Sequence, residues 1–243
     1  MKDPCLRSGK VDIGFVLDSS GSVGSEFGKV IEFCKKIVVD MKPGVGGAGG
    51  SRVGVVRYGS KAGVEFDFDR GDDMSRVLSE LHRLSSIRGS GCTNTTGALK
   101  EAGLSLFKVQ TRSNADGCWV SRSCCRRFRQ SSRSSGRSSG AASGSNGGRA
   151  VGSGRQVLVL MSDGASNVGG DPSSVAKELR SSGIDIYAIG IGSSISRREL
   201  MSIASKPSGR YVFQAGNFEK LPAVVPAIEE GMCGCKCLAV NNE

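Results

Sequence analysis

Residues Val11–Ser22 read VDIGFVLDSSGS, and this stretch decides the fold. It opens with a largely apolar run whose length and β-branched content are typical of an interior strand of a parallel sheet. The chain then turns polar at Asp18 and continues with serines and glycine. In an open α/β sheet, ligands bind just beyond the carboxyl ends of the strands. We therefore expect a carboxylate and neighbouring hydroxyls at the functional edge of such a sheet.

Strand-like and helix-like segments alternate along the rest of the chain. Segments typical of strands are Arg52–Tyr58, Val64–Phe68, Gln156–Met161, Ile184–Ile191 and Arg210–Phe213. Segments typical of helices are Ser25–Met41, Asp72–Leu84, Thr95–Phe107, Asp171–Ser182, Ser196–Ser205 and Phe218–Met232, with Ser25 and Ser196 as N-caps. The second and third strands are expected to pair as a hairpin. This pattern predicts an α/β fold with a doubly wound, mostly parallel sheet, one antiparallel edge strand and helices on both faces.

The basic charge of the chain is concentrated in one segment. The formal net charge is +10, and residues 110–155 contribute +8 of it through nine Arg, no Lys and one acid. Ser, Gly and Arg dominate this segment, which cannot bury enough apolar surface to offset its ordering entropy, so we expect disorder. We interpret it as a flexible insertion, with contact to a polyanion such as a heparin-like chain as the functional alternative. The charge therefore does not indicate a nucleic-acid-binding fold.

The nine cysteines frame the predicted domain organisation. We expect an N-terminal flank at 1–10, one domain at 11–232 that is interrupted by the insertion, and a Cys-rich C-terminal flank at 233–243. Cysteines at both ends of a domain favour an oxidising compartment and a disulfide bond between the termini. Reduced thiols in a cytosolic protein and a metal-binding C-x-C-x-C tract are the alternatives. No run of about 18 apolar residues occurs, so no transmembrane helix is predicted.

Three polar clusters follow or flank the predicted strands and could meet at the carboxyl edge of the sheet. They are Asp18–Ser22, the loop around Thr93, and Ser162–Gly164. Together they offer two carboxylates and three hydroxyls without a His or a thiolate. Hard oxygen ligands of this kind suit Mg²⁺, Mn²⁺ or Ca²⁺ rather than zinc. Water would complete the coordination shell and could exchange for the carboxylate of a ligand.

This arrangement resembles the metal-ion-dependent adhesion site of the von Willebrand factor type A (vWA) domain, also called the I domain in integrins. The residues that match the family's motifs are Asp18, Ser20 and Ser22 for D-x-S-x-S, Thr93 (with Thr95 as the alternative) in GCTNTTGAL, and Asp163 in LVLMSDG. The resemblance covers nearly the whole chain outside residues 110–155.

The resemblance implies divalent-cation-dependent adhesion rather than catalysis. The five matched residues would hold Mg²⁺, Mn²⁺ or Ca²⁺, partly through water, and a Glu or Asp side chain of an extracellular protein ligand would complete the coordination. The family also moves its last helix when the ligand binds. We therefore expect an extracellular module, either secreted or part of an ectodomain. We expect Asp18→Ala to abolish metal-dependent binding and to leave the fold largely intact, because this carboxylate is a site residue and not a core residue.

Enzymatic functions fit the sequence poorly. An aspartyl nucleophile at Asp18 would need a second carboxylate two residues further on, where Ser20 stands. Residues 24–30 lack the spacing and the hydroxyl of a phosphate-binding loop. The only histidine, His82, lies on a predicted helix and gives no basis for a Ser/His/Asp triad. Two further hypotheses stay open, an intracellular vWA-type scaffold with reduced cysteines and a structural matrix module that does not use its metal site.

Overall fold

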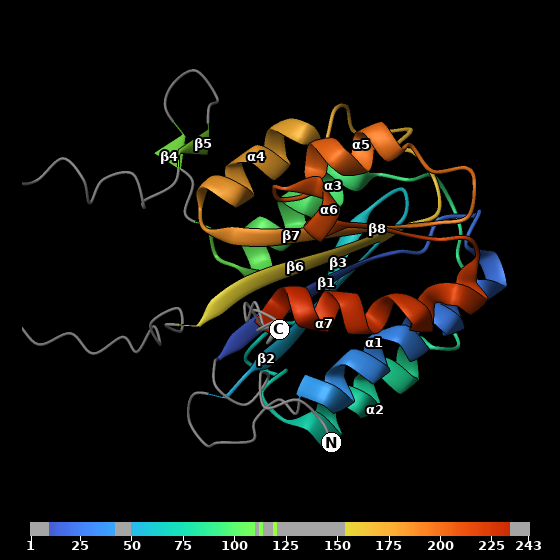
Figure 1. The fold of residues 1–243 in the computed structure, drawn as a ribbon, viewed down its shortest axis with the longest axis vertical. Helices are drawn as coiled ribbons and strands as arrows, with labels where there is room; N and C mark the ends of the chain where they lie inside the picture. The colour runs from blue at the N-terminus through green and yellow to red at the C-terminus, as the bar shows by residue number, and fades with distance from the viewer. Residues whose placement is uncertain (1–9, 42–49, 110–111, 114–118, 121–153, 234–243) are drawn as a thin grey trace, which may run out of the picture.

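Six strands form one sheet in the computed structural model, which describes residues 10–41, 50–109, 112–113, 119–120 and 154–233 (Figure 1). In order across the sheet they are β3 (Ala62–Phe66), β2 (Arg52–Tyr58), β1 (Val11–Asp18), β6 (Arg155–Ser162), β7 (Ile184–Ile191) and β8 (Val212–Ala215). The edge strand β3 runs antiparallel to β2, and the other five strands are parallel. The predicted fold class is confirmed.

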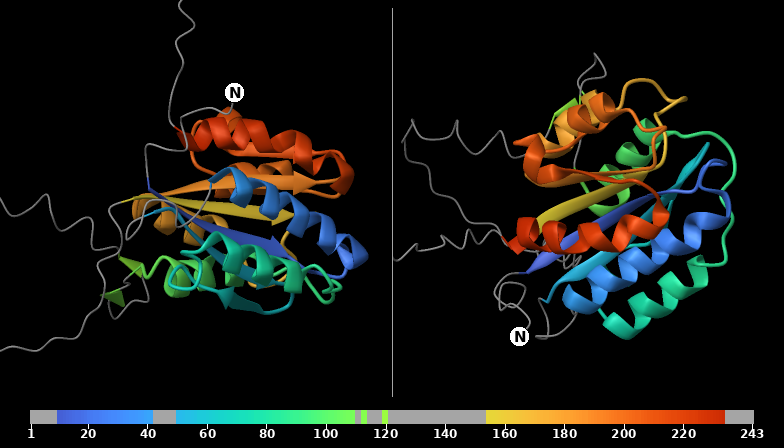
Figure 2. Two further views of the ribbon diagram at one scale, coloured as in Figure 1. Left: turned by 90° about the horizontal axis from the view of Figure 1, so that it is seen from below. Right: turned by 45° about the vertical axis from the view of Figure 1, so that its right-hand side comes forward.

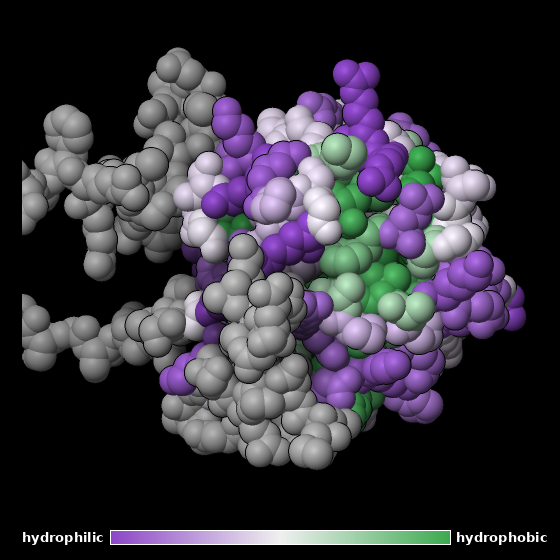
Figure 3. Space-filling view, viewed as in Figure 1, coloured by the Kyte–Doolittle hydropathy of each residue, from purple (hydrophilic) through white to green (hydrophobic). Residues whose placement is uncertain are grey.

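Helices cover both faces of this sheet (Figure 2). One face carries α1 (Phe27–Met41), α2 (Met74–Leu84) and α7 (Val225–Cys233), and the other carries α3 (Thr95–Glu101) and α4 (Ser173–Ser181), with α5 (Arg197–Ile203) beside α4. Strand β1 is buried along its whole length because it supplies both apolar layers. Its residues Ile13 and Phe15 point to the α1 side, and Val16 points to the α3 side. Apolar side chains also reach the surface over β8, where Val212 and Phe213 are half-buried (Figure 3).

Helix ends differ from the sequence-based predictions where local geometry intervenes. Ser25 lies inside a 3₁₀ turn, η2 (Gly24–Glu26), so the prediction that it caps α1 is wrong. Ser196 does cap α5, because its hydroxyl accepts the backbone N–H of Glu199. The helix that follows Thr95 continues as a π-helical turn, η3 (Ala102–Leu106). The closing helix begins as a 3₁₀ segment, η5 (Phe218–Val224), because Pro222 inside it has no N–H to donate.

Two strand boundaries also move. The hairpin of β2 and β3 is confirmed, but β3 begins two residues before the predicted start at Val64, and Phe68 lies beyond it. The last strand starts later than predicted because Arg210 belongs to a short helix, α6 (Ser208–Tyr211). Within the described residues, no helix is long and apolar enough to cross a membrane.

Most of the predicted insertion at 110–155 lies outside the described residues. Its described part contains β4 (Arg112–Ser113) and β5 (Trp119–Val120), which pair antiparallel where no regular structure was predicted. Arg155 opens β6 and pairs with Asp185 at 2.6 Å, so this residue belongs to the sheet rather than to the insertion.

The predicted disulfide between the flanks also falls outside the described side chains. The side chains of two cysteines, Cys34 and Cys92, are described, and both are free thiols. Cys34 is buried in the core beneath α1, and burial raises the pKa of its thiol well above the ordinary value. Cys92 is exposed.

Candidate metal centre

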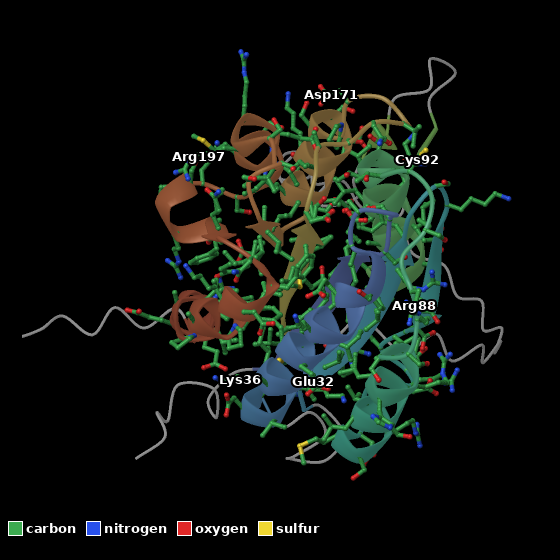
Figure 4. All side chains as sticks on the ribbon, turned by 90° about the vertical axis from the view of Figure 1, so that its right-hand side faces the viewer. Glu32, Lys36, Arg88, Cys92, Asp171 and Arg197 are labelled. Atoms are coloured by element: carbon green, nitrogen blue, oxygen red, sulfur yellow. The ribbon has the colours of Figure 1, made fainter. Side chains whose placement is uncertain are left out.

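The predicted polar clusters meet at the carboxyl edge of the sheet, which faces the viewer in Figure 4. Strands β1 and β6 are parallel neighbours, with Leu17 paired to Met161. Asp18 and Ser162, the last residues of these strands, therefore lie next to each other. Adjacent strands of one sheet thus bring together two segments that are far apart in the sequence.

Both carboxylate oxygens of Asp18 accept hydrogen bonds. The backbone N–H of Ser20 donates to Oδ1 at 2.8 Å, and the hydroxyl of Ser162 donates to Oδ2 at 2.7 Å. The Asp18 side chain is only 2% exposed. Asp18 is therefore part of the buried structure, contrary to the expectation that it stands apart from the core, and Asp18→Asn preserves its shape better than Asp18→Ala.

A second set of hydrogen bonds joins the β1 loop to Asp163. The Ser22 hydroxyl donates to Asp163 Oδ1 at 2.8 Å, and the hydroxyls of Ser20 and Ser22 are 3.1 Å apart. Ser20 is buried, whereas Ser22 is exposed. Four of the five predicted site residues therefore form one cluster.

The Thr93 loop is fastened to the same edge through its backbone. Thr93 N–H donates to the Asn167 side chain at 2.9 Å, and its carbonyl accepts the N–H of Asn167 at 3.0 Å. On the other side, the N–H of Gly21 donates to the carbonyl of Gly91 at 2.9 Å. Thr93 thus lies between the Asp18 loop and the segment after Asp163, with its side chain 4% exposed. Thr93 remains the predicted fifth ligand.

Thr95, the alternative, is the first residue of α3 and is 1% exposed. It lies beside the phenol of Tyr58, which is fully buried and whose hydroxyl donates to the carbonyl of Met161 at 3.4 Å. The Thr95 hydroxyl is buried and has no hydrogen-bond partner among the described residues, so Thr95 stays the alternative ligand.

Close backbone contact between two loops requires a glycine at position 89. Gly89 N–H donates to the carbonyl of Gly24 at 2.8 Å. A Cβ at position 89 would lie 2.2 Å from the carbonyl oxygen of Ser20. Any side chain there would push the 89–92 loop away from the Asp18 loop.

The electrostatics of the cluster are unfavourable without a cation. Burial raises the pKa of Asp18, hydrogen bonds from Ser20 and Ser162 oppose the shift, and the charge of Asp163 adds to it. Burial likewise raises the pKa of Asp163, opposed by the Ser22 hydrogen bond. Within the described residues, neither carboxylate forms an ion pair with Lys, Arg or His. Buried charges are normally paired or coordinate a metal, so the donor set fits a cation.

The chemistry of the donors indicates which cations fit. The cluster offers two carboxylates and several hydroxyls, the oxygen ligands preferred by Mg²⁺, Mn²⁺ and Ca²⁺. In the part of the chain that the structure describes, no three side chains of His, Cys, Asp and Glu gather into a metal-binding group. A cation at this edge would therefore depend on the hydroxyls as well as on the two carboxylates.

Three supporting residues were not assigned roles from the sequence. Ser162 holds Asp18, Asn167 holds the Thr93 backbone, and Glu199 accepts the N–H of Ser166 at 3.0 Å, which ties α5 to the loop after Asp163. Of these three, only Ser162 could have been recognised from the local sequence, because it stands directly before Asp163 at the end of a strand.

Comparison with known sequences supports a single family. The sequence profile of the von Willebrand factor type A domain matches residues 12–116 and 139–227. Among similar proteins, the collagen alpha-1(XXI) chain of Xenopus laevis is 26% identical over 231 residues, covering 93% of this chain and 19% of that protein. Integrin alpha-M of Mus musculus is 27% identical over 228 residues, covering 90% and 16%. Vitrin of Mus musculus is 26% identical, covering 94% and 28%. The chain thus spans less than a third of each relative.

Solved structures show the same fold. Proximal thread matrix protein 1 from the mussel byssus superposes with a TM-score of 0.67 at 22% identity, covering 94% of this chain and 47% of that chain. A second structure of that protein has a zinc-occupied metal-ion-dependent adhesion site (MIDAS) motif. It gives a TM-score of 0.68 at 22% identity, covering 96% of this chain and 47% of that chain. At this level of identity the likeness concerns the fold.

Proposed function

Because the chain belongs to the von Willebrand factor type A domain family, we propose that it is a divalent-cation-dependent protein-binding module of the extracellular matrix or the cell surface. Its relatives include a collagen chain, an integrin subunit and vitrin, which are matrix and adhesion proteins. The similarity to these proteins supports an extracellular location and favours this function over an intracellular scaffold. It also supports binding rather than catalysis.

The proposed cation site consists of the five matched residues, Asp18, Ser20, Ser22, Thr93 and Asp163. Mg²⁺ is the proposed cation, with Mn²⁺ or Ca²⁺ as alternatives, and water would complete its shell. When bound, the ion would supply a Lewis-acidic position that accepts a Glu or Asp carboxylate of the partner protein. Because the mussel protein has a structure with zinc in its MIDAS motif, zinc belongs in any comparison of cations.

The proposal rests on the burial of two carboxylates that have no cationic partner among the described residues. Two carboxylates, Asp18 and Asp163, are 2% and 8% exposed and have only hydroxyl and amide partners among the described residues. Burial of a charge without compensation is costly. A divalent cation between the β1 and β6 loops would remove that cost, and the hydroxyls already point at the carboxylates.

Calorimetric titration with Mg²⁺ tests the site. We expect saturable binding to the wild type and none to Asp163→Ala, with Asp185→Ala as a control in which a carboxylate at the opposite edge of the sheet is removed. Circular dichroism establishes that each variant is folded. A folded wild type that takes up neither Mg²⁺ nor Mn²⁺ would contradict the proposal, as would equal binding by the Asp163 variant.

A further inference from the structure

We infer that the ligand is an acidic polypeptide segment carrying further carboxylates on both sides of the one that reaches the cation. This inference rests on the proposed metal-dependent function and deepens it. It comes from four exposed cations, Lys61, Arg88, Arg197 and Arg198, on three segments that border the proposed metal site. We call these four residues the basic rim.

Arg88 is placed at the site by its neighbours in the chain. The next residue, Gly89, contacts the Asp18 loop through the carbonyl of Gly24, and Ser90 N–H donates to the carbonyl of Ser19 at 2.8 Å. Arg88 therefore stands where the 89–92 loop joins the Asp18 loop. Its side chain is exposed, and it lies on the flank of this edge opposite Arg197 (Figure 4).

Arg197 and Arg198 lie in the first turn of α5, beyond the segment that follows Asp163. The adjacent residue, Glu199, accepts the N–H of Ser166 at 3.0 Å, and the Ser166 hydroxyl donates to the carbonyl of Thr93 at 3.4 Å. This chain of contacts fixes the start of α5 against the Thr93 loop. Both arginines are exposed.

Lys61 approaches the site from a third direction, on the turn between β2 and β3. Its carbonyl accepts the N–H of Gly59 at 3.0 Å, and the carbonyl of Gly59 accepts the N–H of Asn94 at 3.0 Å. Lys61 is thus held beside the Thr93 loop with its side chain exposed.

The basic rim has no ionic partners of its own within the described residues. Other arginines of this chain do pair, for example Arg57 with Glu65 at 2.6 Å and Arg70 with Glu80 at 2.7 Å. Two acids near the rim, Glu199 and Asp171, form no ion pair with it within the described residues and accept hydrogen bonds from neutral groups instead. Glu199 accepts a backbone N–H, and the carboxylate of Asp171 accepts both the N–H and the hydroxyl of Ser173.

Charge complementarity selects the partner. With a divalent cation bound to two carboxylates, the centre of this edge would carry no excess negative charge, and the surrounding cations would attract anions. The cations sit on three separate segments around the site, two of them loops and the third the first turn of α5, rather than along a continuous track. That geometry suits a short segment that crosses the site with acids before and after the coordinating carboxylate. A long polysaccharide polyanion would instead be best served by an unbroken basic stripe.

Two synthetic peptides provide the test. The first has one central Glu among Gly and Ser, and the second carries Asp residues on both sides of that Glu. Binding is followed by fluorescence anisotropy in Mg²⁺ and in EDTA. We expect the second peptide to bind about tenfold more tightly in Mg²⁺, because several exposed ion pairs, each weak alone, together supply about 1.4 kcal/mol, which is tenfold. That advantage should shrink as NaCl is raised.

Matched variants assign the effect to the basic rim. Replacing Arg88, Arg197 and Arg198 by Gln should remove most of the advantage of the acidic peptide and change binding of the single-Glu peptide by less than about twofold. Replacing Lys36, Lys100 and Lys177 by Gln removes the same charge from α1, α3 and α4 and should leave the advantage in place.

The outcomes separate this inference from the proposed function. Equal Mg²⁺-dependent binding of both peptides would overturn the inference and leave the proposed function standing. Equal binding of the acidic peptide in EDTA, or tighter binding of heparin than of this peptide, would also overturn it, because the rim would then act as a general polyanion surface. Failure of both peptides to bind in Mg²⁺ would overturn the inference, whereas the proposed function fails only if the folded wild type also takes up neither Mg²⁺ nor Mn²⁺ in the calorimetric titration.

Discussion

Carboxylates at the two edges of the sheet have different kinds of partner. At the amino edge, Asp12 is 3% exposed and forms two hydrogen bonds with the Arg52 guanidinium, at 2.8 and 2.6 Å. Arg155 pairs there with Asp185, which is half-buried, through two contacts to a single carboxylate oxygen, Oδ2. At the carboxyl edge, Asp18 and Asp163 are 2% and 8% exposed, yet their partners are hydroxyls and amides.

The difference separates structure from function within one sheet. A buried carboxylate requires compensation of its charge. The amino edge supplies this compensation from its own arginines, so removal of one partner there would leave an uncompensated charge. On our proposal, an external cation would supply the compensation at the carboxyl edge, and binding would be located there for that reason.

Breaking a pair at the amino edge should have the largest effect on stability. Arg52→Met leaves Asp12 buried without a counter-charge, so we expect the free energy of unfolding to fall by about 3–5 kcal/mol. Urea unfolding in EDTA measures it. Arg76→Met is the control, because Arg76 and Asp72 are 3.8 Å apart and half-exposed, and its cost should stay below about 1 kcal/mol. Similar losses in the two variants would show that the amino edge is not held by paired charges.

Removing a supporting hydroxyl at the carboxyl edge should weaken cation binding rather than the fold. Ser162→Ala removes the donor to Asp18 Oδ2, and the loss of such a supporting partner typically lowers metal affinity by about 10- to 100-fold. Ser19→Ala is the matched control, because that buried hydroxyl donates to the carbonyl of Tyr58 instead. Mg²⁺ affinities of the two variants, measured by calorimetry, should differ by at least about tenfold. Equal affinities would remove Ser162 from the site.

The smallest expected effect is a pH dependence whose sign depends on the cation. Burial raises the pKa of Asp18 in the metal-free protein. A raised pKa means that ionisation costs stability above the folded-state pKa, and that this cost disappears as the pH falls toward the ordinary value of the unfolded chain. In EDTA, the free energy of unfolding of wild type should therefore rise relative to that of Asp18→Asn as the pH falls from about 7 to about 4. In Mg²⁺, the stability of wild type relative to Asp18→Asn should instead fall with the pH, because protons compete with the cation for the carboxylate. A stability difference that does not vary with pH in EDTA would contradict this.

Much of the fold was predictable because its signals are local. The buried strand that ends at Asp18, the second one that ends beside Asp163, and the alternation with amphipathic helices predict the sheet and the edge at which the site lies. The hairpin was predictable because two strand-like segments flank a short glycine-bearing turn.

The remaining features depend on contacts that no local pattern reveals. Ser25 would cap a helix by composition, but the chain enters α1 through the turn η2. Arg210 fits a strand by its neighbours, yet its guanidinium donates to the carbonyl of Gly231 near the end of α7. Glu199 reaches Ser166 across more than thirty residues. Such long-range contacts position the site and are set by the assembled fold.

The most direct test of the contrast between the edges is the unfolding of wild type and Asp18→Asn with and without Mg²⁺. In EDTA, Asp18→Asn should be at least as stable as wild type, because it removes an uncompensated buried charge and keeps the shape of the side chain. In Mg²⁺ the order should reverse, with wild type gaining about 2.7 kcal/mol at a cation concentration of about 100 Kd and the variant gaining almost nothing. A wild type that gains nothing from Mg²⁺ and exceeds the variant in stability under both conditions would contradict the account.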